Sequence, residues 1–386
     1  MKRILAVTST RADYGILRRL LLKLDATPDI DLRIVATGTH LQPEYGMTVA
    51  EIEQDGFHID KVIPMGLSDT APGTIVNAMA RLSGAMGDYL QDNSFDLMIL
   101  LGDRSEMLSV AGAAVVMQVP ICHLHGGELS LGSYDEFIRH AITKMSHLHL
   151  TSTEEYLHRV LQLGESEENV INVGSLGVES VVASMENMDR RDLASLSVGD
   201  VFGVVLFHPE TLGDTGLAAR QTDVLLGALR AAAMQFVFVG ANSDAGAEDI
   251  MTRVRTYVEQ DDMRSFVIPS ASTKVFHTLV HFSQFLIGNS SSGLIEVPSL
   301  GVPTINLGDR QKGRVRGGSV IDVPVTEGAI RSAIMKAQSD DFRQQARLCE
   351  NPYYQPDSLE KAYGFITSRV RAGIPLVKNF VDRNFK

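Results

Sequence analysis

Acids and imidazoles gather where predicted strands end in the first half of the chain. Asp103 follows the apolar run 97–101, His125 and Glu128 follow the run 120–124, and Asp135 opens a predicted helix. The crevice beyond the carboxyl ends of parallel strands binds ligands, so these side chains should converge on one pocket. Crowded carboxylates can supply an acid and a base together, because one keeps its proton while its neighbour stays ionised. The pattern predicts an enzyme that transfers protons.

Part of this acidic group has a structural alternative. Glu136 can complete a capping box with Ser133 before the predicted helix 137–145, and Asp135 can form an i,i+4 ion pair with Arg139. Neither explanation applies to Asp103, which stands directly after a strand. Neither applies to Glu128, which follows Gly126-Gly127, so Asp103 and Glu128 are the two acids without a structural alternative.

The first turn, residues 8–15, is one of two candidate anion sites. It follows the first predicted strand and carries hydroxyls and Arg11 at a helix start, where backbone N–H groups and a guanidinium can hold a phosphate. An ordinary capped loop explains the same residues. The turn lacks Gly-x-Gly-x-x-Gly, so no dinucleotide fingerprint is present.

The second candidate anion site is the run 285–293, which leads from a strand into small polar residues that open a helix. A simple cap would need one Ser or Asn, so four polar residues flanked by glycines favour a ligand. Glu296, one turn into the predicted helix, could accept hydrogen bonds from a ribose diol. The predicted binding residues here are Asn289, Ser290, Ser291 and Gly293.

Three further loops follow strands of the second half. His208 ends the run 201–207 beside a proline, where a histidine can be functional or simply structural. The loop 240–246 offers Asn242 and Asp244 to a base, sugar or diphosphate, or forms a plain turn. Arg310 and Arg314 lie on a basic loop that binds the nucleotide or is merely solvated.

Composition narrows the functional classes. The 386 residues carry a net charge of −12, which argues against nucleic-acid or anionic-membrane partners because both need a cationic face. Cys122 and Cys349 lack the spacing of a zinc or redox site. The N-terminal apolar run 4–7 is too short for a signal peptide, and no stretch is long enough to span a bilayer. We expect a cytoplasmic protein.

The elements that must position these residues form two sets. Short apolar runs at 4–7, 32–36, 97–101, 120–124 and 147–151 alternate with helix-length segments, and the pattern restarts at 201–207, 236–239, 266–268, 284–287, 303–306 and 319–323. Such alternation predicts an α/β fold of two Rossmann-like, doubly wound domains facing a cleft. We expect a catalytic domain over 1–178 and a nucleotide-binding domain over 179–357, with the segment 358–386 packing back onto the first.

The motifs together resemble the hydrolysing UDP-N-acetylglucosamine 2-epimerase family over nearly the whole chain. In order they are Thr10-Arg11-Ala12-Asp13-Tyr14-Gly15, Gly102-Asp103-Arg104, Gly126-Gly127-Glu128, Asp135-Glu136-x-Ile138-Arg139-His140, His208-Pro209, Gly288-Asn289-Ser290-Ser291 and Gly308-Asp309-Arg310-Gln311. The resemblance implies a glycosyltransferase-B-like fold, catalytic carboxylates at Asp103 and Asp135, and a diphosphate or catalytic role for His208. It also implies nucleotide contacts by Arg11, Ser290, Ser291, Glu296 and Arg310.

One departure from the family pattern concerns the second strand end. Several members carry Ile-Glu-Gly-Gly-Glu where this chain has Leu124-His125-Gly126-Gly127-Glu128. The acid or base role of that first Glu falls here to His125, to Glu128 or to neither. The segment 131–134 is also one residue longer, which leaves the choice between Asp135 and Glu136 open.

The resemblance implies a reaction that needs no cofactor and no metal. A UDP-linked 2-acetamido sugar, either UDP-N-acetylglucosamine or UDP-2,4-diacetamido-2,4,6-trideoxyglucose, would lose UDP and its C2 proton to give a glycal. Water addition would then release the free manno-configured sugar for sialic or legionaminic acid synthesis. A non-hydrolysing 2-epimerase, a glycosyltransferase of the same fold and a non-catalytic sugar-nucleotide sensor are the alternatives. A homodimer is expected, while the sugar and the choice of UDP or GDP stay open.

Overall fold

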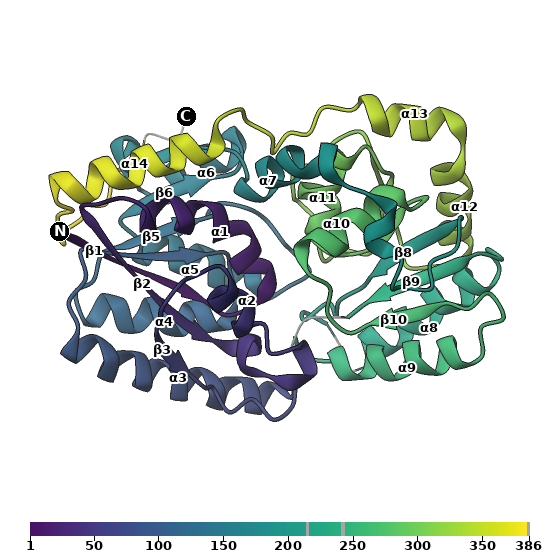
Figure 1. Cartoon of the computed structure of the whole chain (residues 1–386), viewed down its shortest axis with the longest axis horizontal. Helices are drawn as coiled ribbons and strands as arrows, with labels where there is room; N and C mark the ends of the chain where they lie inside the picture. The colour runs from purple at the N-terminus through teal and green to yellow at the C-terminus, as the bar shows by residue number, and fades with distance from the viewer. Residues whose placement is uncertain (214–215, 241–243, 384–386) are drawn as a thin grey trace. The chain divides into compact units, whose positions relative to one another are not determined.

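The chain folds into two compact units, each a parallel sheet with helices on both faces (Figure 1). The computed structural model describes residues 1–213, 216–240 and 244–383. Unit 1 comprises Met1–Glu128, Asp135–Ser180 and Tyr353–Lys386, and unit 2 comprises Leu129–Tyr134 and Val181–Pro352. The predicted fold class, two doubly wound α/β domains, is confirmed.

Unit 1 contains a seven-stranded sheet in the order β3-β2-β1-β4-β5-β6-β7, and every neighbouring pair is parallel. The strand order reverses between β1 and β4, which makes their carboxyl ends the expected ligand-binding edge. The strands are β1 Lys2–Thr8, β2 Ile30–Thr37, β3 Ile59–Ile63, β4 Leu97–Leu101, β5 Ile121–Leu124, β6 Leu148–Thr151 and β7 Val170–Asn172.

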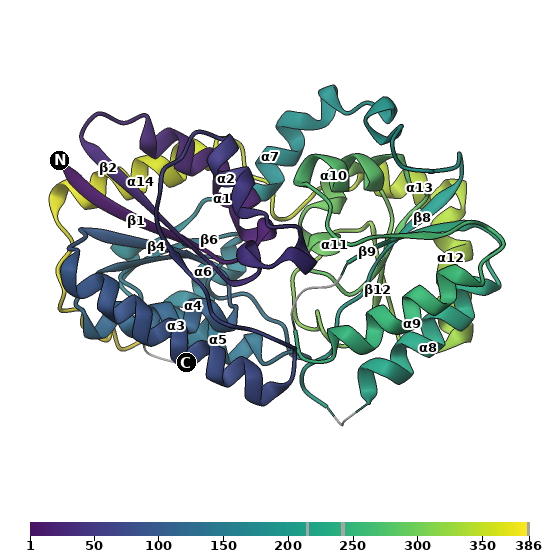
Figure 2. The same ribbon diagram turned by 60° about the horizontal axis from the view of Figure 1, so that its bottom comes forward.

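Helices cover both faces of this sheet (Figure 2). Helices α1 and α14 lie side by side on one face, and α3, α4 and α5 cover the other. Leu17 and Leu20 of α1 share one buried cluster with Ile366 and Val370 of α14, so the last helix completes the core of unit 1. The helices are α1 Arg11–Asp25, α2 Val49–Gln54, α3 Pro72–Asp92, α4 Ser105–Val116, α5 Asp135–Met145, α6 Glu154–Gln162 and α14 Ser358–Ala372, and α7 Leu176–Ser184 begins in unit 1 and ends in unit 2.

Unit 2 repeats the plan with six parallel strands in the order β10-β9-β8-β11-β12-β13, whose reversal falls between β8 and β11. One buried cluster lies under α8, α9 and α12, and a second lies under α10. No described helix in either unit combines the length and apolar character that crossing a bilayer requires. The elements are β8 Phe202–Leu206, α8 Leu217–Arg230, β9 Gln235–Val239, α9 Ala247–Glu259, β10 Phe266–Ile268, α10 Thr273–Phe282, β11 Leu286–Gly288, α11 Ser292–Ile295, β12 Thr304–Leu307, β13 Val320–Val323, α12 Glu327–Gln338 and α13 Asp340–Leu348.

Two strands of unit 1 escape the sequence pattern, and both are sheet edges. β3 carries Asp60 and Lys61 and is largely open to solvent, while β7 has only three residues. An edge strand buries less and tolerates charge, which also protects it from pairing with other chains. Apolar runs therefore identify the inner strands of a sheet better than its borders.

Candidate functional site

The centre of the site in unit 1 is Arg139, whose side chain is only 1% exposed. Its Nε donates to Asp103 Oδ2 at 2.9 Å and its Nη2 donates to the same oxygen, while Nη1 donates to Glu128 O at 2.8 Å. A guanidinium buried without acceptors would cost several kcal/mol, roughly 3–5 on removal of a partner. The guanidinium of Arg139 therefore holds the Asp103 carboxylate at the carboxyl end of β4.

Helix α5 adds a second acid to this cation. Glu136 Oε2 accepts from Arg139 Nη1 at 2.9 Å, and Glu136 Oε1 lies 3.0 Å from His140 Nε2. Ser133, the residue expected to form a capping box with Glu136, has its Oγ 3.0 Å from Thr211 Oγ1, and the capping box stays a prediction. Asp135 is the first residue of α5, so the helix begins at the predicted catalytic acid.

His125 and Glu128 form a hydrogen-bonded pair after β5. His125 Nδ1 lies 2.8 Å from Glu128 Oε1, and Ser152 Oγ donates to the same oxygen at 2.7 Å. Nε2 of His125 is buried, and no described residue is hydrogen-bonded to it. If Nδ1 carries the proton toward Glu128, Nε2 presents a lone pair, which is how a carboxylate prepares a histidine for acid–base work.

The backbone around this pair is tightly constrained. His125 has φ +65°, a conformation uncommon for a residue with a side chain. Gly127 has φ +78°, and a Cβ there would lie 2.5 Å from Tyr156 O. The two glycines of the motif thus let the chain turn sharply against α6, and this turn brings Glu128 back to His125.

The first turn, for which the sequence allowed an anion site or an ordinary capped loop, has the hydrogen bonds of a capped loop. Thr10 caps α1 by accepting from Asp13 N at 3.2 Å, and the buried Asp13 carboxylate accepts from the N–H of Ser9 at 2.9 Å. Arg11 forms an ion pair with Glu51 of α2. A nucleotide contact by Arg11 would require this pair to open or to share the guanidinium.

In unit 2 the strand ends at the order reversal are joined by Asn289. Its Oδ1 accepts from His208 N at 2.7 Å and its Nδ2 donates to His208 O at 2.8 Å, so the amide ties β11 to the residue after β8. The approach is close because a Cβ on Gly288 would lie 1.9 Å from Leu206 O. Asn289 is fully buried, and both polar atoms of its side-chain amide are hydrogen-bonded to His208; the ligand contact predicted for it stays a prediction.

The hydroxyl-rich run after β11 is partly open to solvent and partly packed. Ser290 Oγ lies 3.0 Å from Ser292 Oγ, and both residues and Ser291 are incompletely buried. Gly293 packs against β12, where Thr304 Oγ1 donates to its carbonyl at 2.8 Å. The serines are therefore the accessible members of this run.

The helix expected after the serines is present but short, and Glu296 lies at its end. α11 ends at Ile295 because Pro298 has no N–H to continue it, so Glu296 caps the helix and does not lie one turn inside it. The Glu296 carboxylate lies 3.3 Å from Nε2 of His277, a residue of α10. His277 thus orients the acid that was expected to meet a ribose.

The basic loop after β12 is held by hydrogen bonds to Asn289, which follows β11. Arg310 Nη1 and Gln311 Nε2 donate to Asn289 O at 3.3 and 2.9 Å, and Arg310 Nη2 lies 3.3 Å from Asp244 Oδ2. Arg314 Nε donates to Leu129 O at 3.3 Å. The predicted contact Asn242 lies outside the described residues. Arg310 is therefore placed beside the serine run and is not a freely solvated cation.

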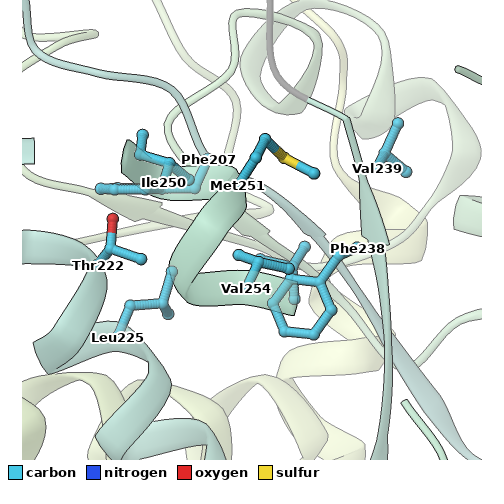
Figure 3. A pocket seen from close by; sticks show the side chains of 9 residues that line it. Phe207, Thr222, Leu225, Phe238, Val239, Ile250, Met251 and Val254 are labelled. Carbon is cyan, nitrogen blue, oxygen red and sulfur yellow. The ribbon is translucent and has the colours of Figure 1, made fainter. Parts of the chain in front are cut away.

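A small apolar pocket also lies in unit 2, among β8, β9, α8 and α9 (Figure 3). Among the described residues its lining is apolar apart from Thr222, whose hydroxyl donates to Ala218 O at 2.7 Å. Such a lining cannot orient a diphosphate, so this pocket is a packing gap within the core. The lining residues are Val205, Phe207, Thr222, Leu225, Phe238, Val239, Ile250, Met251 and Val254.

Sequence reasoning missed the residues that orient the candidates. Arg139 was expected only as an ion-pair partner, and Ser152, Thr211 and His277 were not considered. Their contacts span long sequence separations, such as the 36 residues between Asp103 and Arg139. Within the described residues, no three His, Cys, Asp or Glu side chains gather as metal ligands would.

Comparison with known proteins gives consistent family matches. A family model described as UDP-N-acetylglucosamine 2-epimerase matches residues 22–367. The chain is 44% identical to polysialic acid biosynthesis protein P7 of Escherichia coli, covering 99% of this chain and 98% of that protein. It is 35% identical to the hydrolysing GDP/UDP-N,N'-diacetylbacillosamine 2-epimerase of Campylobacter jejuni, covering 99% of both.

Solved structures agree on the fold. The crystal structure of UDP-GlcNAc 2-epimerase from Neisseria meningitidis bound to UDP-GlcNAc superimposes with a TM-score of 0.81 at 16% identity. The superposition covers 95% of this chain and 100% of that one. At this identity the likeness establishes the two-domain architecture.

Proposed function

This chain belongs to the UDP-N-acetylglucosamine 2-epimerase family, and on that basis we propose that it is a hydrolysing 2-epimerase. Its substrate is a UDP-linked 2-acetamido sugar, and its products are UDP and the free manno-configured sugar. UDP-N-acetylglucosamine and UDP-2,4-diacetamido-2,4,6-trideoxyglucose are the two candidate substrates. The Campylobacter jejuni relative, named a hydrolysing 2-epimerase, supports the hydrolytic outcome.

The reaction has two stages. A base removes the C2 proton while the bond from C1 to the diphosphate oxygen breaks, which yields a 2-acetamidoglycal and UDP. Water then adds its oxygen to C1 and loses a proton, while an acid delivers a proton to C2 from the opposite face. Both stages need proton carriers on the sugar and positive charge on the leaving diphosphate.

The observation that carries the proposal is the grouping of proton-transfer side chains in unit 1. Asp103 is held by a buried guanidinium, and His125 is paired with Glu128 through Nδ1 while its Nε2 is without a partner among described residues. We assign proton transfer at C2 to Asp103 and His125, orientation of His125 to Glu128, and water activation to Asp135. In this assignment His125 takes the place of the Glu that several family members carry.

Unit 2 supplies the nucleotide contacts in this proposal. Ser290, Ser291, Arg310 and His208 bind the diphosphate, and Glu296 accepts from the ribose. The support is that strand ends at the order reversal of a doubly wound sheet bind ligands. His208, Ser290 and Ser291 follow those strands, and Arg310 is bound to the carbonyl of Asn289 beside them. Arg11 and Arg314 add charge, and Asp244 orients Arg310.

The test is turnover in D2O with each candidate donor, followed by NMR. We expect UDP to accumulate in step with a free manno-configured sugar that carries one deuterium at C2. A non-hydrolysing 2-epimerase would give a UDP-sugar mixture without free UDP. A glycosyltransferase would leave the donor intact in the absence of an acceptor.

The setting of the enzyme is part of the same proposal. Both cysteines are unpaired thiols, and burial raises the pKa of Cys122, which suits a reducing cytoplasm. A homodimer, implied by the family resemblance, can be tested by light scattering of the purified chain. A monomer at working concentration would contradict it.

A further inference from the structure

A buried imidazole that the reaction does not use lies directly behind Asp103. His123 belongs to β5 and is fully buried. Its Nε2 lies 2.7 Å from the carbonyl oxygen of Gly102, the residue before Asp103, and its Nδ1 lies 3.2 Å from Thr143 Oγ1 on α5. One ring therefore contacts both the turn that carries Asp103 and the helix that carries Arg139.

The chemistry of this contact fixes the state of the ring. A carbonyl oxygen only accepts, so the 2.7 Å contact places the ring proton on Nε2. Nδ1 then faces the Thr143 hydroxyl with a lone pair at 3.2 Å, and because that hydroxyl also donates to Arg139 O at 3.0 Å, its one proton is shared between the two acceptors. Burial lowers the pKa of His123 to about 3, so the ring stays neutral and carries no protons for the reaction.

The peptide that His123 holds is one that could otherwise rotate. Gly102 has φ +80°, and nothing lies within 4 Å of the position of a Cβ there, so side-chain packing does not restrain it. The Gly102 carbonyl orients the peptide bond that leads into Asp103. Without the hydrogen bond from His123, the Asp103 carboxylate would lose its fixed distance to Arg139.

We propose that His123 is a positioning residue: by donating to Gly102 O while its Nδ1 contacts the Thr143 hydroxyl, it holds Asp103 in register with helix α5. The inference rests on the proposed role of Asp103 in proton transfer. His149 provides a matched control, because it is equally buried, is the register partner of His123 on β6, and bonds to Glu165 Oε2 at 3.1 Å.

Three variants test this proposal. His123→Leu removes the donor at similar volume, His123→Gln keeps an N–H at the same reach along the side chain, and His149→Gln is the control. A misplacement of about 1 Å can cost ~100-fold, so we expect kcat of His123→Leu to fall about 30-fold or more. UDP affinity by calorimetry should change less than about twofold, and His123→Gln should recover most of kcat.

The opposing results are equally specific. A folded His123→Leu with near wild-type kcat, an inactive His123→Gln, or a His149→Gln with the same loss would overturn the proposal. Should His123→Leu not fold, ¹⁵N-histidine NMR of the wild type decides: a proton on Nε2 of neutral His123 supports it, and a proton on Nδ1 contradicts it.

A failure of the proposed function can be distinguished from a failure of the positioning role of His123. If the wild type releases no UDP from any donor, the hydrolysing assignment fails. Crystal structures of His123→Leu and the wild type then decide the positioning claim alone. An Asp103 carboxylate displaced from Arg139 only in the variant supports the claim, and an unchanged pair overturns it.

Discussion

At the scale of single residues, the site is built from candidates that are each held by a second side chain. Arg139 holds Asp103, Glu128 holds His125, and His277 holds Glu296. Such pairs fix the direction of the reacting group before a substrate arrives. Substitutions that keep shape but remove charge are therefore the most informative.

Asp103→Asn should remove most turnover and leave UDP affinity nearly intact. The amide keeps the size of the carboxylate but cannot exchange protons, so we expect kcat to fall about 10²- to 10⁴-fold. Nucleotide release and calorimetric titration with UDP measure the two properties on the same preparation. Full activity in a folded Asp103→Asn would exclude Asp103 as the base.

Glu128→Gln should lower kcat through His125. A neutral amide no longer favours the proton on Nδ1 and no longer stabilises the charged ring, so a loss of about 10²- to 10⁴-fold is expected. Ser152→Ala is the control, because it removes only the hydroxyl that donates to the same carboxylate at 2.7 Å. Equal losses in both variants would assign the effect to local packing.

At the scale of elements, Glu165 joins the tail to the sheet. Its carboxylate accepts from His149 on β6, from Lys144 on α5 and from Lys378 in the tail. Burial alone would raise the pKa of Glu165, but these three hydrogen bonds outweigh it and lower the pKa to about 2. The carboxylate is therefore an ionic anchor for residues 373–383.

Because of this anchor, the free energy of unfolding should decrease as the pH falls. The pKa of Glu165 is lower in the folded chain, so its contribution is complete above the unfolded value near 4.5 and is lost as the pH falls toward 2. Because the lysines are partly solvated, we expect ionised Glu165 to contribute about 2 kcal/mol to the free energy of unfolding, which is less than its full pKa shift would give. Urea unfolding of the wild type and Glu165→Gln at pH 7 and pH 3 measures this contribution. The variant should be less stable than the wild type at pH 7, and the difference in the free energy of unfolding should be smaller at pH 3.

Elements also show what the sequence can predict. Inner strands follow from apolar runs, and the loops at their carboxyl ends follow from topology, so Asp103, His125 and His208 were located beside their strands. The edge strands β3 and β7 and the short length of α11 were not predicted, because charge, length and Pro298 obscure them. The inward roles of Asn289 and Arg139 depend on partners 81 and 36 residues away, which spacing does not reveal.

At the scale of the whole molecule, unit 1 is discontinuous, and its last piece is structural. Ile366 of α14 is fully buried against α1, whereas Glu360 on the same helix is exposed. Ile366→Ala should destabilise unit 1 by about 2–5 kcal/mol, and Glu360→Ala by less than about 1 kcal/mol. Hydrogen exchange should increase across unit 1 and stay unchanged across unit 2. A uniform increase would indicate a single cooperative unit.

The return of the chain to unit 1 at Tyr353 also sets an order of events on the ribosome. All of unit 2 has been translated when Pro352 emerges, while the layer beside α1 still lacks the helix that covers its apolar face. Nascent unit 2 can therefore fold first, and nascent unit 1 exposes apolar surface until residues 358–372 have emerged. A ribosome stalled in this interval would present an incomplete catalytic half to chaperones.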